Sequence, residues 1–416
     1  MIKSFLSVSP FFLGAIGSLL FSLVIVRLLG FDVLGQFSVI YSLTQFVVLV
    51  SRRGMGVALT RYAAGETSVR RIKGLVFCLK RGLKASIIGI VALFLVSIFF
   101  LCVGSFDYFI LSLLLSFSVI PSVYMFIYCG YMKGIGEVFK SAFYSNGYVF
   151  LVSSCVLTFL WVFGVSSVQV FAITFVITQF AWVVILSRRF LLFYLRFRVY
   201  RRWNGNNREI VSLSDNISVS NIFSSFYSII SILLVGCFVP DHDVGYFKIF
   251  TQVVTLTTFI TSVLVASVGS EIADYFKNSS LVNLQKTSVK LSFMQLLAVP
   301  LCVIGAFLYF YLSGVLFIEA LPTIIYVFVF FTLVINIIFG AAANWLNLTK
   351  YDEVVRKVTT TMFLPLSISF SYFTWQFGLV GATLCLLIGI MLQTMTLYLI
   401  LKAKLPINYP CYKRVD

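Results

Sequence analysis

Apolar segments long enough to cross a bilayer recur along the whole chain and alternate with short polar stretches. A transmembrane helix needs roughly 20 mainly apolar residues. Windows that meet this condition predict helices over residues 8–29, 34–62, 82–103, 108–132, 142–163, 168–187, 214–237, 244–269, 291–312, 320–346, 356–375 and 379–401. The pattern therefore predicts an all-α integral membrane protein of about 12 transmembrane helices, with both termini on one side.

Composition agrees with this pattern and excludes other classes. Of the 416 residues, 60% are hydrophobic and only 11% are charged, whereas soluble proteins average roughly 25% charged residues. A soluble enzyme, a secreted disulfide scaffold and a disordered chain are all excluded. The first apolar run continues to Leu29, past the length of a signal peptide, so we interpret it as the first span.

Loops on the two sides of the predicted spans differ in charge. One set contains no Lys or Arg; these loops surround residues 31–32, 107, 165, 241–243, 319 and 376. The opposite set carries basic clusters, the longest between Arg188 and Arg208. The net charge of +17 therefore indicates membrane topology and not nucleic-acid binding. By the positive-inside rule, both termini are predicted to be cytoplasmic.

The basic stretch 188–213 divides the chain into two halves of six predicted helices. We predict an N-terminal lobe over residues 1–187, a cytoplasmic connector over 188–213 and a C-terminal lobe over 214–416. A weak repeat at an offset of 210 aligns Leu34-Gly35-Gln36-Phe37 with Val244-Gly245-Tyr246-Phe247. Two such halves would be related by a pseudo-two-fold axis along the membrane normal, and they predict alternating access around a cavity between the lobes.

Four cations lie inside or at the edge of the predicted spans, namely Arg27, Arg52, Arg53 and Lys248. A charge at such a depth is costly and suggests function, so we predict that these side chains bind an anionic head group. In the alternative interpretation, Arg27 and Lys248 extend to the outer interface, and Arg52 and Arg53 are ordinary cytoplasmic anchors.

Amide side chains within the spans are candidate sugar contacts: Gln45, Asn221, Gln252, Asn336 and Asn344. The alternative is that they only serve close helix packing. All fourteen acidic residues lie in loops or at helix ends, which leaves no mid-membrane carboxylate to bind a proton, sodium or an organic cation. The interior therefore favours an anionic substrate.

Cysteine and histidine give no sign of redox or metal chemistry. The eight Cys show no CxxC spacing, and the chain has a single histidine, His242. Neither a disulfide framework nor a metal site is indicated. We predict no cofactor, no metal and no catalytic residues.

Short motifs near the start of the chain resemble those of a known family. Arg27-Leu28-Leu29-Gly30, Leu34-Gly35-Gln36-Phe37-Ser38 and Gly56-Val57-Ala58-Leu59-Thr60-Arg61-Tyr62 look like the start of polysaccharide flippases of the Wzx type. These polysaccharide biosynthesis proteins belong to the multidrug/oligosaccharidyl-lipid/polysaccharide exporter (MOP) superfamily.

The resemblance implies the MOP fold and a location in the bacterial cytoplasmic (inner) membrane. It implies that undecaprenyl-diphosphate-linked oligosaccharide, an O-antigen (lipopolysaccharide) or capsular repeat unit, is flipped from the cytoplasmic to the outer leaflet. The implied partners are this lipid-linked oligosaccharide, membrane lipids, and a polymerase and other polysaccharide-assembly proteins. Arg suits a diphosphate as a forked donor, and amides suit sugar hydroxyls.

Two other functions remain as alternatives. A polysaccharide polymerase or ligase usually has a large outward loop with Arg and acidic residues, whereas the outward loops here are short and lack Lys and Arg. A multidrug or organic-cation exporter of the same fold commonly carries an acidic residue in its first helix, and residues 8–29 contain none.

Overall fold

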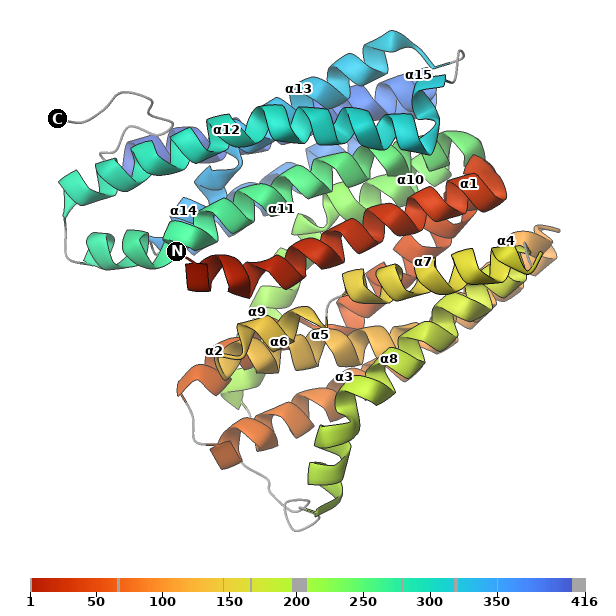
Figure 1. The fold of residues 1–416 in the computed structure, drawn as a ribbon, viewed down its shortest axis with the longest axis horizontal. Coiled ribbons are helices and arrows are strands. Elements are labelled where there is room, and N and C mark those ends of the chain that lie inside the picture. Colours follow the sequence, from red (N-terminus) through yellow and green to blue (C-terminus); the bar gives the residue numbers. More distant parts are fainter. Residues whose placement is uncertain are drawn as a thin grey trace. The chain divides into compact units, whose positions relative to one another are not determined.

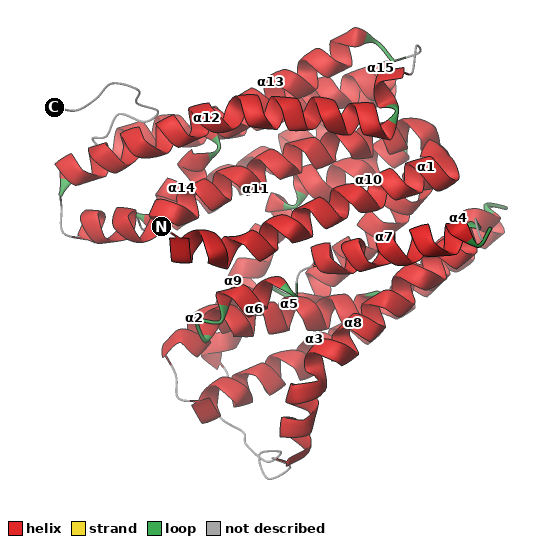
Figure 2. Ribbon diagram, in the orientation of Figure 1, coloured by secondary structure: helices red, strands yellow, loops and turns green. Residues whose placement is uncertain are grey.

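The computed structural model consists of helices joined by short loops, with no strand in the part of the chain that it describes (Figures 1 and 2). The described residues are 2–65, 68–144, 146–164, 167–196, 208–277, 280–317, 321–349 and 351–405. Each predicted span has a helical counterpart, so the all-α membrane class is confirmed. The chain packs into two compact units, one of Leu6–Ser225 and one of Phe226–Asp416 with Met1–Phe5. The unit boundary lies at Ser225/Phe226, and the lobe boundaries given above stay a prediction.

The unit Leu6–Ser225, called here the N-unit, is formed by the first nine α-helices, except for the first residues of α1 up to Phe5. They are α1 (Ile2–Arg52), α2 (Met55–Gly65), α3 (Ser68–Cys102), α4 (Phe106–Ser116), α5 (Val119–Gly134), α6 (Val138–Ala142), α7 (Asn146–Val162), α8 (Val168–Arg196) and α9 (Arg208–Ser224). Helix α1 contains the first predicted span and most of the second, and these join at a sharp bend at Gly30 (φ 91°, ψ 175°). Glycine suits this position because it has no Cβ to oppose a positive φ.

The remaining unit, called here the C-unit, contains the second half of the chain. Its elements are the π-helix η2 (Phe226–Ile230), α10 (Ser231–Gly236), α11 (Asp241–Lys277), α12 (Leu281–Ser313), the 3-10 helix η3 (Val315–Phe317), α13 (Thr323–Phe339), α14 (Ala341–Leu348) and α15 (Asp352–Lys404). Helix α15 contains the last two predicted spans, and Gly378 (φ 55°) marks the bend between them. This bend lies beside the outer loop predicted around residue 376.

Four predicted spans are interrupted where the apolar pattern shows no break. The span 214–237 divides into α9, η2 and α10, and the span 320–346 divides into α13 and α14 at Gly340. The span 34–62 divides between α1 and α2 at Arg53 (φ 42°) and Gly54 (φ 67°). The span 108–132 divides into α4 and α5, which are bent by 42° relative to each other. The prediction of a continuous helix was therefore wrong at these four places, because hydropathy indicates that a segment lies in the membrane and carries no information on its backbone angles.

Close packing of small residues fixes α2 against α5 in the N-unit. A Cβ added at Gly130 would lie 2.0 Å from the carbonyl oxygen of Gly56. The Thr60 hydroxyl donates to the carbonyl oxygen of Gly130 at 2.9 Å. Such contacts between small residues stabilise helix pairs in lipid, where no hydrophobic force joins the helices.

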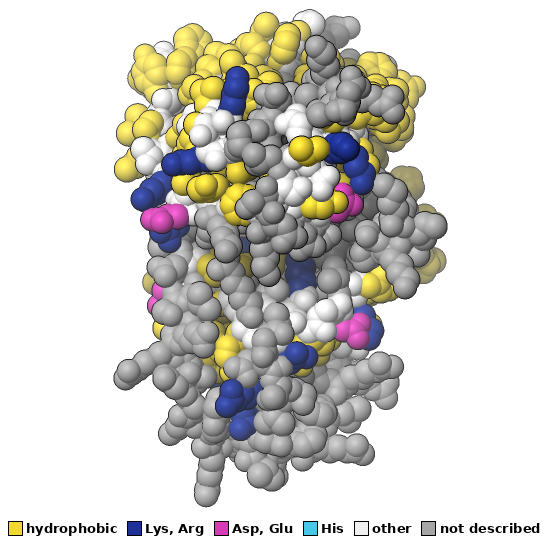
Figure 3. All heavy atoms as spheres, turned by 90° about the vertical axis from the view of Figure 1, so that its left-hand side faces the viewer, with side chains coloured by type: hydrophobic (Ala, Val, Ile, Leu, Met, Phe, Trp, Pro, Cys, Tyr) yellow, Lys and Arg dark blue, Asp and Glu magenta, His cyan; other side chains and the backbone are white. Residues whose placement is uncertain are grey.

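Length and composition of the described helices agree with a multi-pass membrane protein. Seven helices are long and apolar enough to cross a membrane, and the bent pair α4 and α5 makes up to eight. Leu13–Arg52 and Glu353–Lys404 each contain one of the glycine bends. The first covers parts of two predicted spans, and the second covers two predicted spans almost completely. Among the side chains coloured in Figure 3, Lys and Arg with a few acidic residues lie on the end of the molecule shown there.

Candidate substrate-binding site

A polar stripe runs along the second half of α1 in the N-unit. Ser38, Gln45 and Arg52 follow each other at steps of seven residues, which is about two helical turns, so they share one face. The Ser38 hydroxyl, the Gln45 Nε2 and the Arg52 Nε are buried and have no hydrogen-bond partner among the described residues. A buried polar group without a partner costs about 1–3 kcal/mol, so this face favours a polar ligand or water.

Arg52 ends this stripe and lies over an aromatic ring. Its Cζ is 4.2 Å from the centre of the Phe126 ring on α5, a cation–π contact that holds the guanidinium in place. No described Asp or Glu forms an ion pair with Arg52. The half-buried guanidinium therefore lacks a counter-charge from the described protein.

The break after Arg52 is joined to α9. The Ser214 hydroxyl donates to the carbonyl oxygen of Arg53, and a Cβ added at Gly54 would lie 2.8 Å from the Ser214 carbonyl oxygen. Next to this contact, Arg81 of α3 pairs with Asp215 of α9 at 3.6 Å. The exposed Arg53 thus lies beside the helix that carries the predicted sugar contact Asn221.

An amide that the sequence analysis missed lies level with Gln45. The Phe37 ring is 5.0 Å from that of Phe171, and the Tyr41 ring is 5.7 Å from that of Phe175. Phe37 and Tyr41, four residues apart on α1, thus contact Phe171 and Phe175, four residues apart on α8. The residue numbers rise in the same direction on both helices, so the two segments run in parallel. One further turn brings Gln45 level with Gln179.

Gln179 is 0% exposed, and neither its amide nitrogen nor its amide oxygen has a hydrogen-bond partner in the described part of the chain. The sequence signal was present, since Gln179 is the amide at the centre of the apolar run 168–187. The criterion that selected Gln45 also selects Gln179. Gln179 therefore adds a further unsatisfied amide to the N-unit beside the stripe of Ser38, Gln45 and Arg52.

In the C-unit, a shorter stripe on α11 contains Lys248, Gln252 and Thr255 at steps of four and three residues. Lys248 is half-buried and forms no ion pair with a described acidic residue. The Gln252 Oε1 accepts a 2.6 Å hydrogen bond from the Tyr309 hydroxyl of α12. Lys248 is therefore the charged member of a stripe whose amide is already bonded.

The Asn336 side chain forms hydrogen bonds within the C-unit. Its Nδ2 donates to the Thr257 and Thr258 hydroxyls at 2.9 and 2.7 Å, which joins α13 to α11. This geometry agrees with the packing alternative for Asn336. Asn344 on α14 is half-buried.

The predicted site residues thus fall into two sets. Arg27, Gln45, Arg52, Arg53 and Asn221 lie in the N-unit, and Lys248, Gln252, Asn336 and Asn344 lie in the C-unit. Arg27 is exposed, three residues before the Gly30 bend, and its role stays a prediction. The structure brings Arg53 to α9 and Arg52 to Phe126 of α5, and the cavity between the lobes stays a prediction.

The described side chains offer no cluster for a metal ion. Among them, no group of three or more His, Cys, Asp or Glu side chains could hold one. Every described Asp or Glu lies outside the apolar spans, or at an end or a bend of one. The arrangement can bind and orient an anionic or hydroxyl-rich molecule.

Searches against protein-family models and against curated proteins found no match. Solved structures are similar over almost the whole chain. One is an inward-facing multidrug resistance MATE family transporter of the MOP superfamily, with a TM-score of 0.67, 14% identity and coverage of 97% of this chain and 98% of that one. Another is the MATE multidrug transporter DinF-BH (TM-score 0.66, 14% identity, coverage 96% and 94%).

A third similar structure is a MOP superfamily transporter from Pyrococcus furiosus. It is described as having a binding pocket of reversed polarity that suggests a different function (TM-score 0.65, 14% identity, coverage 97% and 96%). The chain therefore has the fold of MOP superfamily transporters, a multi-pass membrane fold with about 12 transmembrane helices.

Proposed function

We propose that this protein is a membrane transporter that flips undecaprenyl-diphosphate-linked oligosaccharide from the cytoplasmic to the outer leaflet. The fold supports transport, because proteins of this fold include transporters captured in inward-facing and outward-facing conformations. Alternating access moves a bound molecule across the membrane by exposing one site first to one side and then to the other.

The observation that carries the substrate class is the charge of the apolar helices. Arg52 and Lys248 are half-buried and have no acidic partner among the described residues. A charge in such a place is stabilised when an opposite charge approaches. A diphosphate supplies that charge, and a guanidinium binds it with two parallel hydrogen bonds.

Amide groups support the saccharide part of the substrate. Gln45 and Gln179 have unsatisfied polar atoms, and an amide offers both donors and acceptors to sugar hydroxyls. The hydrocarbon tail of the carrier stays in the bilayer while the polar head crosses. This function requires no bond to be made or broken.

Multidrug export is the second candidate. The names of the structural neighbours favour it, since two of those reported above are multidrug transporters. The neighbour with a pocket of reversed polarity shows that the fold also occurs with other pocket charges. For a cationic drug, the described spans offer no carboxylate away from their ends and bends.

Deletion of the gene in a strain without a second flippase separates the candidate functions. Loss of a flippase should leave lipid-linked saccharide assembled but trapped on the cytoplasmic face, with little surface polymer. Loss of a polymerase or ligase would leave single units that still reach the surface. Loss of a drug exporter would change only the tolerance to cationic compounds, so normal surface polymer in the deletion strain would overturn the proposal.

A further inference from the structure

An apolar groove of about 380 Å³ lies between α7 and α8 on the N-unit. Its lining is Val152, Val156, Thr174, Ile177, Thr178, Ala181, Trp182 and Ile185. The side chains of Ile177 and Ile185 are 61% and 65% exposed, so the groove opens outward from the unit. Its volume falls within the range of sites that bind a small molecule, roughly 300–1,000 Å³.

The shape of the groove follows from the residues along α8. Ile177, Ala181 and Ile185 are spaced four apart, and the small Ala181 leaves a depression between two larger branched side chains. The Thr178 hydroxyl donates to the Thr174 carbonyl oxygen at 2.7 Å, so it is satisfied within its own helix. The walls therefore suit a branched hydrocarbon chain.

One end of the groove is fixed by hydrogen bonds from aromatic residues. The Trp182 indole N–H donates to the Phe143 carbonyl oxygen at 2.8 Å, and the Tyr144 hydroxyl donates to the Leu186 carbonyl oxygen at 3.0 Å. The Trp182 ring stacks on Tyr148, with 6.2 Å between ring centres. Trp and Tyr with an apolar body and a bonded polar tip are typical of the membrane–water interface.

Basic residues follow at this same end. Helix α8 continues past Ile185 to Arg188 and Arg189, and Lys140 of α6 lies three residues before Phe143. Lys140 pairs with Glu137 at 3.0 Å, so the two arginines carry the excess positive charge. The positive-inside rule places this end at the cytoplasmic surface.

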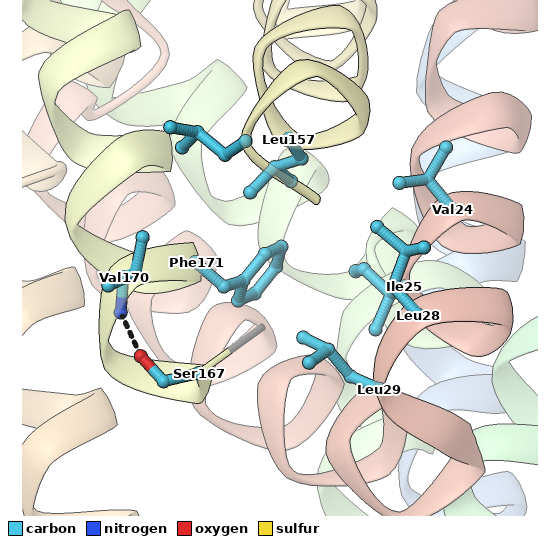
Figure 4. A pocket seen from close by; sticks show the side chains of 9 residues that line it. Val24, Ile25, Leu28, Leu29, Leu157, Ser167, Val170 and Phe171 are labelled. Atoms are coloured by element: carbon cyan, nitrogen blue, oxygen red, sulfur yellow. Dashed lines mark hydrogen bonds between the residues drawn. The ribbon is translucent and has the colours of Figure 1, made fainter. Parts of the chain in front are cut away.

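A second apolar groove in the N-unit is much smaller, at about 20 Å³. It lies among α1, α7 and α8 and is lined by Val24, Ile25, Leu28, Leu29, Leu157, Leu160, Ser167, Val170 and Phe171 (Figure 4). The neighbouring loop around residue 165 contains no Lys or Arg. Of these two grooves, only the α7–α8 groove is large enough to hold part of a hydrocarbon chain.

We propose that the α7–α8 groove binds the polyprenyl chain of a polyprenyl-phosphate lipid, with the phosphate toward the end of the groove from which α8 continues to residues 188 and 189. The inference rests on the proposed function, since the substrate carries such a chain and must wait at the cytoplasmic leaflet before it is flipped. The groove is then the place where the carrier lipid is held while its head group enters the transport path.

Photolabelling of the full-length protein tests this site. Purified protein in phosphatidylcholine nanodiscs is exposed to undecaprenyl phosphate that carries a diazirine in its chain, and labelled peptides are mapped by mass spectrometry. Labelling should concentrate on residues 152–156 and 177–185. Ala181→Trp fills the groove and should lower labelling by about tenfold, the change expected from losing contact with roughly two methylene groups.

Val184→Trp is the matched control, because Val184 is on the same helix, is 66% exposed and does not line the groove; its labelling should equal that of the wild type. Ala181→Leu serves if Ala181→Trp fails to fold. Replacing Arg188 and Arg189 with Gln should weaken labelling by the phosphate probe and leave labelling by an uncharged polyprenol probe unchanged.

Equal competition by phosphatidylglycerol would identify an ordinary phospholipid site and overturn the inference, as would unchanged labelling of Ala181→Trp. A flipping assay on the same samples separates this from the proposed function. If the wild-type protein flips the saccharide but Ala181→Trp is labelled as strongly as the wild type, only the proposed lipid site in the groove is contradicted. Wild-type protein that is labelled in the groove but flips nothing contradicts the proposed function alone.

Discussion

The buried amide side chains discussed above differ in hydrogen bonding between the two units. In the C-unit, Asn336 bonds to two threonines, Gln252 accepts from Tyr309, and Gln295 donates to the Ile337 carbonyl oxygen at 2.6 Å. In the N-unit, Gln179 and the Gln45 Nε2 are buried without a partner among the described residues. Satisfied amides join helices, whereas unsatisfied ones favour a ligand, so residues of one type serve different purposes in the two units.

Arg52 should show the largest effect on transport. Arg52→Ala removes a charge that can form hydrogen bonds of about 1.5–3 kcal/mol each, so flipping of lipid-linked saccharide should fall roughly 10- to 100-fold at unchanged protein level. Arg52→Lys should retain part of the activity, because it keeps the charge and loses the fork. Arg27→Ala, at an exposed position, is the comparison and should flip at nearly the wild-type rate. Equal loss in both alanine variants would contradict a special role for Arg52.

Asn336→Leu should lower stability more than it lowers substrate affinity. The change removes the bonds to Thr257 and Thr258, each worth about 0.5–1.5 kcal/mol, so the protein should unfold about 1–3 kcal/mol more easily. Thermal unfolding in detergent measures this change. Unaltered stability together with weaker substrate binding would return Asn336 to the set of sugar contacts.

Gln179→Leu should have the opposite result to Asn336→Leu: transport should change more than stability, and its effect on stability should be the smallest of the three. The substitution removes an amide without a described partner from a fully buried position, so unfolding should be unchanged or harder by about 1 kcal/mol. If a polar ligand or water binds there, transport should fall while the protein becomes no less stable. Destabilisation by more than about 1 kcal/mol would show that Gln179 is bonded inside the fold.

Much of this architecture follows from the sequence, and the exceptions have physical causes. The spans were predicted because a bilayer of fixed thickness demands runs of fixed length. The bends at Gly30 and Gly378 fall beside loops predicted from short polar gaps. The break at Arg53 and Gly54 escaped prediction, because it depends on the contact with Ser214 of α9, 161 residues away from Arg53 in the chain.

The site was harder to predict than the fold. The stripe of Gln45 and Arg52 could be found from residue type and spacing, but the bonding state of each amide could not, since it depends on which helix lies opposite. Gln252 and Gln45 were equal candidates in the sequence, and only packing shows that Gln252 bonds to Tyr309. Gln179 was overlooked although it satisfied the same criterion.

Transport by the purified full-length protein in sealed liposomes tests the central claim most directly. One preparation receives undecaprenyl-diphosphate-linked oligosaccharide, and its appearance in the opposite leaflet is followed with a lectin that cannot cross the membrane. A parallel preparation receives a lipophilic cationic dye. Our account predicts that the saccharide crosses and that the dye does not, with saccharide transport lost in Arg52→Ala. Transport of the dye without the saccharide would contradict the account and identify a multidrug exporter.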